Sequence, residues 1–297
     1  MGEQRVLARG EHRVVRQPLA EVGHPAVEAD VERLLAAGPA DDRAVGEKAA
    51  LLVDGDTGTV LYKKNERSEL YPASLTKIMT ALLTLEAVDQ GKLRLDQEIT
   101  ASASALSGLA ADGSSAGIRV GETMTVESFL KCMLVVSANE ACDVLAEAVS
   151  GSVDAFVDAM NARAEALGCE NTHFVNPNGL HDSRHYTSAW DLYLITTEAL
   201  KYPEFMAICD MGVAEIPATN LSEVRRLRTT NYLLSNWRAI GYLYPDAHGI
   251  KTGSTTEAGH CLVSSAKRGS RTLISVVLGA ERVVGADGVA DVRSFSE

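Results

Sequence analysis

The chain has 297 residues, 46% of them hydrophobic, which is enough to bury a core as one large domain or two closely packed lobes. Its 28 Lys and Arg residues against 40 Asp and Glu residues give a formal net charge of −12. A surface this acidic repels phosphate backbones and no basic cluster interrupts it, so the composition argues against nucleic acid as a partner.

Residues 1–47 differ from the rest of the chain. They are charged, are interrupted by three prolines and hold one short amphipathic helix candidate, Ala26–Ala37. We expect a poorly ordered extension there, followed by one folded domain over 48–281 and a C-terminal tail over 282–297.

Signals of cellular location are weak in this sequence. The N-terminus is basic, but no continuous apolar stretch follows it, so no secretory signal peptide is visible. No apolar run approaches the ~20 residues that span a bilayer, and we expect no membrane anchor in this chain. The cysteines are odd in number and scattered, which predicts reduced thiols: Cys132, Cys142, Cys169, Cys209 and Cys261.

A short hairpin is predicted where the folded domain begins. Ala49–Val53 is an apolar run, Asp54–Gly58 has the composition of a turn, and Thr59–Tyr62 has that of a returning strand. The two aspartates of the turn could begin a calcium-binding loop, but the series of ligands that such a loop needs does not continue.

A helical middle and a C-terminal group of strands follow. Helical spacing and end signals predict five helices: Ser74–Asp89, Thr125–Val136, Glu140–Val149, Val153–Leu167 and Ser188–Leu200, the last stopped by Pro203. Three strands are predicted after them: His248–Thr252, Gly259–Ala266 and Arg271–Leu278, the last two joined by Lys267–Ser270. We therefore expect an α/β (α+β) fold with one antiparallel sheet built from both ends of the chain and a helical lobe inserted.

Ser74 and Lys77 lie three residues apart on the first predicted helix, so they share a face with Cβ atoms about 5–6 Å apart. Pro72 would leave Ser74 in the first helical turn, where free N–H groups and the helix dipole favour negative charge. A serine there can pass its proton to a lysine that is held neutral. This arrangement is typical of an activated nucleophile.

The Ser-x-x-Lys spacing occurs three times, so alone it is weak evidence. Ser264 and Lys267 fall around a predicted strand, where residues three apart point to opposite faces. Ser128 and Lys131 share a helix face, but a solvated surface pair explains them equally well. Further motifs are needed to single out Ser74.

Two such motifs occur once each. Ser137-Ala138-Asn139 falls in the break between two predicted helices, which could point a hydroxyl and an amide into a cleft or could be a simple helix cap. Lys251-Thr252-Gly253 ends a predicted strand at a glycine, where a ligand backbone can approach closely. Alone, it would be a surface lysine before a turn.

Ser-x-x-Lys, Ser-x-Asn and Lys-Thr-Gly, in this order, resemble the active site shared by penicillin-binding proteins and serine β-lactamases. Their flanks resemble the D-alanyl-D-alanine carboxypeptidases, the low-molecular-mass penicillin-binding proteins of peptidase family S11. The similarity covers Ala49–Gly279 and includes four flanking segments: Tyr71–Thr80, Gly113–Ser115, Asn176–Leu180 and Thr187–Ala189. It implies a penicillin-binding/serine β-lactamase-like fold and makes 48–281 the catalytic domain.

The resemblance also implies a reaction. Ser74 would attack the bond between the last two D-alanines of a peptidoglycan stem peptide and form an acyl-enzyme that water hydrolyses, and β-lactam antibiotics would acylate the same serine. Lys77 would be the base and Ser137 the proton relay, with the oxyanion held by N–H groups of Ser74 and Ser254. The substrate would be bound by Asn139, Lys251, Thr252, Gly253 and Ser254. No cofactor is implied. The resemblance implies an extracytoplasmic protein, either secreted or located in the cell envelope.

Two alternative functions share this constellation. A serine β-lactamase acylates in the same way, but class A enzymes deacylate with a Glu-x-x-x-Asn pattern, and no glutamate here is followed four residues later by asparagine. A non-catalytic sensor of cell-wall peptide or β-lactam could keep the cleft, but it would not require the nucleophile and base.

A metal site is not favoured. His181 and His185 lie four residues apart with Asp182 between them, a pattern that a metal site could use. They follow an Asn-Gly turn signal rather than lying on a helix, and no third ligand is apparent.

Overall fold

The computed structural model describes residues 46–109, 113–284 and 290–292. Of the two units into which the chain divides, Met1–Asp41 and Asp42–Glu297, only the second contains described residues. The extension expected over 1–47 therefore lies outside the described residues except for its last two, and so does most of the tail over 282–297.

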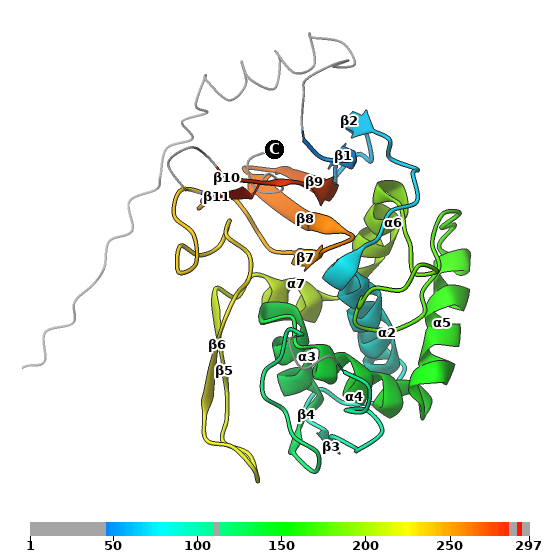
Figure 1. Ribbon diagram of the computed structural model, residues 1–297, viewed down its shortest axis with the longest axis vertical. Coiled ribbons are helices and arrows are strands. Elements are labelled where there is room, and N and C mark those ends of the chain that lie inside the picture. Colours follow the sequence, from blue (N-terminus) through cyan, green and yellow to red (C-terminus); the bar gives the residue numbers. More distant parts are fainter. Residues whose placement is uncertain (1–45, 110–112, 285–289, 293–297) are drawn as a thin grey trace, which may run out of the picture. The chain divides into compact units, whose positions relative to one another are not determined.

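A five-stranded antiparallel sheet is built from both ends of the described chain (Figure 1). Its order is β2-β1-β9-β8-β7. The strands are β1 (Ala49–Asp54), β2 (Val60–Lys64), β7 (Lys251–Thr255), β8 (Gly259–Arg268) and β9 (Arg271–Ala280). The expected architecture is confirmed, because the N-terminal pair β2-β1 joins the C-terminal strands along β9.

The two hairpins of this sheet follow from their turn residues. In the β1–β2 turn, Asp54 Oδ1 accepts hydrogen bonds from the backbone N–H groups of Asp56 and Thr57, both at 3.0 Å, which confirms the predicted turn. β8 and β9 run on through the expected four-residue connection. Gly269 and Ser270 alone join them, with Gly269 at a φ of 60° that glycine adopts without strain.

The strand that begins with Lys251 was predicted in the wrong place. The prediction ended the strand with this motif, whereas β7 begins at Lys251 and continues to Thr255, which pairs with Gly259. Edge position explains the error, since β7 contacts one strand, β8, and its sequence lacks the apolar run of a central strand.

Helices cover the sheet and form the inserted lobe. The described residues form a 3-10 turn and six helices: η1 (Ala73–Thr76), α2 (Lys77–Asp89), α3 (Val126–Val135), α4 (Asn139–Ser150), α5 (Val153–Ala166), α6 (Ala189–Ala199) and α7 (Pro203–Cys209). All five predicted helices are present. α7 was missed because Pro203, expected to stop a helix, occupies the first turn of the next one, where its lacking N–H costs nothing.

Short two-stranded ribbons escaped the sequence analysis as well. They pair β3 (Glu98–Thr100) with β4 (Thr123–Thr125), β5 (Val213–Ile216) with β6 (Arg225–Arg228), and β10 (Arg282–Val284) with β11 (Ala290–Val292). Strands of three or four residues are too short for an alternating pattern to stand out.

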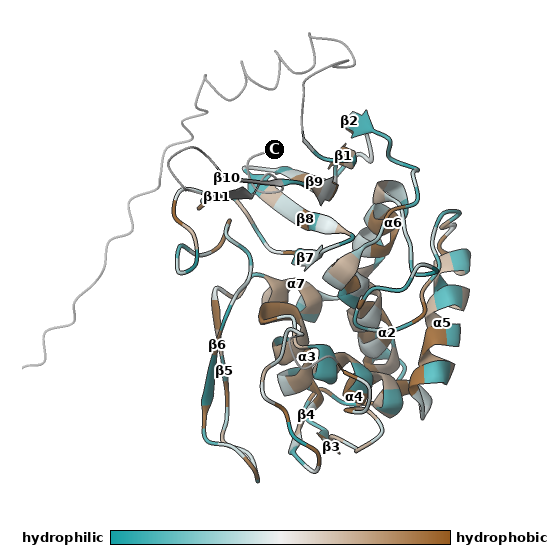
Figure 2. Cartoon of the chain, in the orientation of Figure 1, coloured by the Kyte–Doolittle hydropathy of each residue, from teal (hydrophilic) through white to brown (hydrophobic). Residues whose placement is uncertain are grey.

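The core lies around α2, which packs against α4, α5 and α6. Most of α2 is buried, including residues on every side of the helix. By contrast, α5 is amphipathic: Phe156, Met160 and Ala164 recur at a spacing of four and are its buried residues, and its hydrophilic residues face outward (Figure 2). The segment with Ser74 and Lys77 therefore leads into a helix that is buried on all sides.

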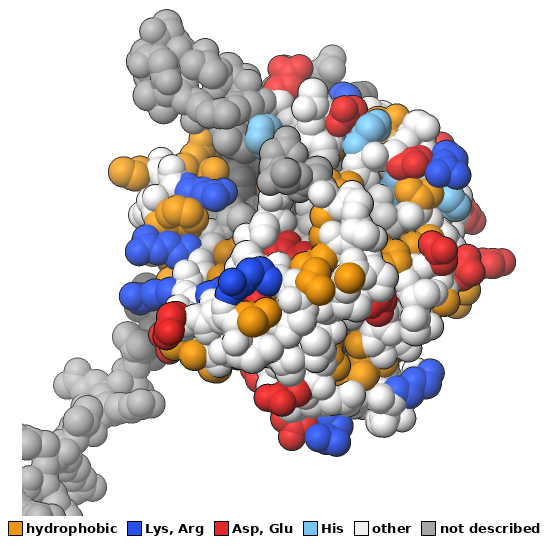
Figure 3. All heavy atoms as spheres, turned by 60° about the horizontal axis from the view of Figure 1, so that its bottom comes forward, with side chains coloured by type: hydrophobic (Ala, Val, Ile, Leu, Met, Phe, Trp, Pro, Cys, Tyr) orange, Lys and Arg blue, Asp and Glu red, His pale blue; other side chains and the backbone are white. Residues whose placement is uncertain are grey.

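Helix hydropathy and the distribution of surface charge complete the description of the fold. No helix in the described ranges is long and apolar enough to cross a membrane. On the face seen in Figure 3, acidic and basic side chains are interspersed with hydrophobic ones.

Candidate active site

Ser74 lies in the 3-10 turn that leads directly into α2. Pro72 precedes this turn, and its carbonyl accepts a hydrogen bond from Leu75 N at 3.2 Å. Ala73 has a φ of 48°, a left-handed conformation that is strained for a residue with a side chain. The predicted helix start is confirmed, but its first turn is tighter than an α-helix and points Ser74 toward Lys77.

Two glycines let the surrounding backbone press against this strained turn. A Cβ atom at Gly179 would lie 1.8 Å from the carbonyl oxygen of Ala73. A Cβ atom at Gly253 would lie 3.0 Å from Ser74 N. The turn is thus clamped between the loop 176–180 and strand β7: only glycine fits at position 179, and a side chain at position 253 would be in tight contact with the turn.

Lys77 is fully buried and is the hub of the site. Its Nζ donates hydrogen bonds to Ser74 Oγ at 2.9 Å, to Asn139 Oδ1 at 2.8 Å and to the backbone carbonyl of Asn178 at 2.6 Å. An uncharged Lys77 would accept the proton of Ser74 along the same 2.9 Å line. The geometry therefore suits a nucleophile and its base.

Ser137 and Lys251 form a second hydrogen-bonded pair. Ser137 occupies the break between α3 and α4 with a φ of 66°, and Lys251 begins β7. Lys251 Nζ is buried and donates to Ser137 Oγ at 3.0 Å and to the carbonyl of Thr252 at 2.9 Å. The break in the helices thus points a hydroxyl toward the sheet.

The other predicted binding residues lie on the same two elements. Asn139 is the first residue of α4, and Thr252, Gly253 and Ser254 continue β7. Thr252 Oγ1 lies 2.6 Å from Thr230 Oγ1, and Ser254 is exposed to solvent. All eight predicted residues therefore lie on η1, α2, the α3–α4 break with the start of α4, or β7.

Burial sets the electrostatics of the two lysines. It lowers the pKa of Lys77 below its usual value, against the opposing influence of Cys142, Asp143 and Glu140. Burial, together with the nearby charge of Lys77, also lowers the pKa of Lys251 to about 7. Two ammonium groups in one dry site disfavour each other, so one of them can be neutral near pH 7, as a general base requires.

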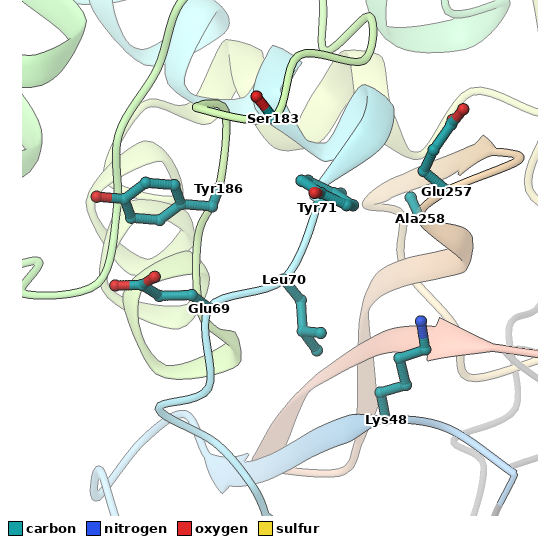
Figure 4. A pocket seen from close by; sticks show the side chains of 8 residues that line it. All are labelled: Lys48, Glu69, Leu70, Tyr71, Ser183, Tyr186, Glu257 and Ala258. Atoms are coloured by element: carbon teal, nitrogen blue, oxygen red, sulfur yellow. The ribbon is translucent and has the colours of Figure 1, made fainter.

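The described residues line two cavities of about 220 Å³ each, and one of them borders α4. One is lined by Asn139, Glu140 and the segment Gly113–Ser115, and so opens beside the predicted site. The other is shown in Figure 4 and is lined by Lys48, Glu69, Leu70, Tyr71, Ser183, Tyr186, Glu257 and Ala258, none of which was predicted to act. Of the eight predicted residues, Asn139 is the one that lines either of these two cavities.

The sequence analysis missed the groups that hold Lys77 and Ser74 in place. Asn178 supplies the carbonyl nearest to Lys77, and its side-chain amide faces the buried carboxyl group of Asp143. His185 contacts Thr76 Oγ1 at 2.8 Å behind the nucleophile. The segment Asn176–Leu180 had been noted as a family-like flank, which is the one signal that could have suggested Asn178.

The two histidines considered as metal ligands both contact other residues of the protein. His185 Nδ1 accepts a hydrogen bond from Val175 N at 3.2 Å, and its Nε2 bonds Thr76. His181 packs its ring edge-on against Tyr71 at 4.7 Å. In the described ranges, no three His, Cys, Asp or Glu residues are grouped as a metal site would require. The five cysteines are free thiols.

The chain has the fold of the penicillin-binding proteins, and two of its serines, Ser74 and Ser137, are each hydrogen-bonded to a buried lysine. Its structure resembles the Streptomyces K15 DD-transpeptidase, with a TM-score of 0.73 and 30% identity over 82% of this chain and 93% of that one. It also resembles penicillin-binding protein D2 of Listeria monocytogenes in its ampicillin-bound form, with a TM-score of 0.69 and 28% identity over 86% of this chain and 96% of that one.

The sequence gives the family. The D-alanyl-D-alanine carboxypeptidase family, peptidase family S11, matches residues 36–282, and the chain belongs to it. D-alanyl-D-alanine carboxypeptidase DacF of Bacillus subtilis is 40% identical over 233 residues, 78% of this chain and 57% of that protein. A D-alanyl-D-alanine endopeptidase of Pseudomonas aeruginosa is 34% identical over 72% of this chain and 65% of that protein. The chain thus spans under two thirds of the length of these curated relatives.

Proposed function

We propose that the protein is a serine-type D-Ala-D-Ala carboxypeptidase that removes the terminal D-alanine from peptidoglycan stem peptides outside the cytoplasm. The observation that carries this proposal is the buried Lys77, 2.9 Å from Ser74 Oγ, inside a family of peptidases of this name. Burial supplies the unprotonated form that a general base needs, because it disfavours the ammonium ion and lowers the pKa of Lys77.

Acylation would proceed as follows. Ser74 Oγ attacks the carbonyl carbon between the two D-alanines while Lys77 takes its proton. The C–N bond then breaks, and Ser137 relays to the leaving amine the proton that Lys77 took from Ser74, so free D-alanine departs and leaves an ester on Ser74. Lys251 donates to Ser137 Oγ at 3.0 Å, which leaves the proton of that hydroxyl free for this relay.

Deacylation and substrate binding use the remaining groups. Water attacks the ester, returns the proton to Ser74 and releases the shortened peptide with a new carboxylate. Lys251 and Thr252 would bind the free C-terminal carboxylate of the substrate, and Asn139 its amide. The N–H groups of Ser74 and Ser254 would stabilise the oxyanion. β-Lactams would acylate Ser74 in the same way and remain covalently attached to it.

The experiment compares Ser74→Ala with Ser128→Ala, which changes another serine of a Ser-x-x-Lys sequence. A peptide ending in D-Ala-D-Ala is incubated with each protein, D-alanine is measured, and the adduct with penicillin is weighed by mass spectrometry. We expect release and adduct for wild type and Ser128→Ala, and neither for Ser74→Ala. A penicillin adduct on Ser74→Ala would refute the assignment of the nucleophile.

The same assay separates the alternatives. A β-lactamase would turn over penicillin faster than the peptide, and a sensor would form the adduct without releasing D-alanine. A transpeptidase would need an added amine and would join the shortened peptide to it. An endopeptidase would prefer cross-linked peptides to the free C-terminus.

A further inference from the structure

A buried carboxyl group lies next to this machinery but has no part in the reaction above. Asp143 is on α4, one helical turn after Asn139, and its exposed fraction is 6%. In the part of the chain that the structure describes, no lysine or arginine forms an ion pair with it. A buried carboxylate without an ion pair is costly, so such a residue needs an explanation.

Its partner is the side-chain amide of Asn178. Asn178 Nδ2 lies 3.4 Å from Asp143 Oδ1 and 3.3 Å from Oδ2, and Asn178 Oδ1 accepts a hydrogen bond from Leu180 N at 2.9 Å. The amide is therefore held at both ends. The backbone carbonyl of the same residue is the acceptor 2.6 Å from Lys77 Nζ.

Asp143 is hydrogen-bonded to the side chain of the residue that supplies one of the three acceptors around Lys77, the Asn178 carbonyl. A second acceptor, Asn139 Oδ1, lies 2.8 Å from Lys77 Nζ and comes from the same helix as Asp143, one turn earlier. Small displacements of these acceptors would move the lysine relative to Ser74, and proton transfer is sensitive to such shifts.

We propose that Asp143 is a positioning residue of the active centre: its carboxyl group binds Asn178, holds the carbonyl that orients Lys77, and by its charge controls how readily Lys77 gives up its proton. This inference rests on the proposed function of Lys77 as the base.

The electrostatic part follows from the groups around Asp143. Burial raises its pKa to about 7, Glu147 and Glu140 of the same helix raise it too, and Asn178 and Lys77 oppose them. Burial also raises the pKa of the neighbouring Cys142 to about 12, so that thiol stays neutral near pH 7. Asp143 therefore changes charge in the pH range where the base must act.

The sign of the effect is defined. An ionised Asp143 favours the ammonium form of Lys77, and so raises the pKa of that lysine. A neutral group at position 143 removes this attraction. Lys77 would then lose its proton at lower pH, and acylation would begin at lower pH as well.

The test uses Asp143→Asn, which keeps the shape and one acceptor oxygen, and Asp143→Ala, which removes the contact with Asn178. Asp158→Asn is the matched control, since Asp158 is exposed on α5. Two quantities are measured between pH 5 and pH 10: the pKa of Lys77, by NMR of ¹³C-labelled lysine side chains, and the rate of acylation by a chromogenic β-lactam.

We expect Asp143→Asn to lower the pKa of Lys77 and the acid limb of the acylation profile by about half a unit to one unit. Asp143→Ala should in addition slow acylation about tenfold. Asp158→Asn should change neither quantity. If Asp143→Ala does not fold, Asp143→Asn decides alone, because it preserves packing.

A wild-type pKa of Lys77 in both Asp143 variants, with unchanged profiles, would overturn the inference. Failure of the proposed function gives a different result. In that case the wild type releases no D-alanine and forms no adduct, whereas the NMR titration still shows whether Asp143 controls Lys77.

Discussion

Two segments of this chain place a serine and a lysine three residues apart on a helix, but their surroundings differ. Lys77 is fully buried and bonds Ser74 Oγ at 2.9 Å. Lys131 keeps 20% of its side chain exposed and forms an ion pair with Glu127 at 2.7 Å. The same spacing thus gives a candidate base in one helix and a solvated ion pair in the other.

The serines differ as much as the lysines. Ser128 belongs to the cap of α3: its N–H donates to Thr125 Oγ1 at 3.1 Å, and its hydroxyl accepts a hydrogen bond from the same threonine at 2.9 Å. Ser74 instead follows the strained Ala73 and faces Lys77. Both helices therefore have the same sequence spacing, whereas burial and backbone strain distinguish Lys77 and the Ser74 turn.

The largest effect should come from replacing the lysines. Lys77→Met should lower the rate of acylation by penicillin by a factor on the order of 10³, since a general base typically contributes 10² to 10⁴. Lys131→Met should leave the rate unchanged and cost at most about 0.5 kcal/mol of stability, as expected for a surface pair at this spacing. Stopped-flow acylation and thermal melting measure the two quantities.

Equal losses of acylation in the two variants would contradict this distinction. Circular dichroism should show both folded, although removal of the buried Lys77 ammonium can raise the melting temperature. Such a rise would itself support the view that stability was given up at this position for chemistry.

Local signals were sufficient to predict much of this fold. Five helices, the β1–β2 hairpin and the joining of both chain ends in one sheet follow from periodicity, caps and turn residues. Three motifs in order also predicted the residues that meet around Lys77 and Lys251. Their roles remain proposals, whereas their proximity is seen in the contacts of Ser74 and Ser137.

The remainder depends on contacts that no local pattern encodes. Lys77 and the carbonyl of Asn178 are 101 residues apart in sequence, and Thr76 and His185 are 109 apart. Asp143 occupies a helix position that periodicity marks only as buried, so its partner is visible in three dimensions alone. The positive φ of Ala73, and the close approach of Gly179 and Gly253 to its turn, are likewise visible only in three dimensions.

The clamp on the Ser74 turn can be tested with glycine substitutions. Gly179→Ala would place a Cβ atom 1.8 Å from the carbonyl oxygen of Ala73, at a φ of 85° that disfavours side chains. Strain and overpacking together should cost about 3 kcal/mol or more and disturb acylation. Gly168→Ala is the control, since its φ of 78° is similar but nothing lies within 4 Å of the added atom.

Gly168→Ala should cost about 1 kcal/mol from backbone strain alone and leave acylation intact. Denaturant melts and the acylation rate of both variants are the measurements. Suppose Gly179→Ala had the stability of Gly168→Ala and the acylation rate of the wild type. The close packing of loop 176–180 against the Ser74 turn would then not be needed for the reaction.

The smallest expected effect concerns the histidine behind the turn. Val175 N–H donates to His185 Nδ1, so Nε2 carries the ring proton and donates to Thr76 Oγ1, which in turn donates to the carbonyl of Ala73 at 2.9 Å. Burial is the main cause that lowers the pKa of His185 from 6.5 to about 4. At the start of α3, by contrast, the backbone near Ser128 is supported by one side chain, the N-cap Thr125.

The direction of the pH effect follows from that depressed pKa. Between pH 6.5 and pH 4 the unfolded chain binds a proton at His185 that the folded protein resists, so the folded state loses stability as pH falls through this window. From pH 7 to pH 5 this residue should cost the wild type about 2 kcal/mol. His185→Gln keeps a donor for Thr76 but does not titrate, and its stability should fall by that much less over the same interval. Parallel pH dependences of urea melts in the two proteins would show that His185 is protonated without cost, and that the neutral ring is not what supports the Ser74 turn.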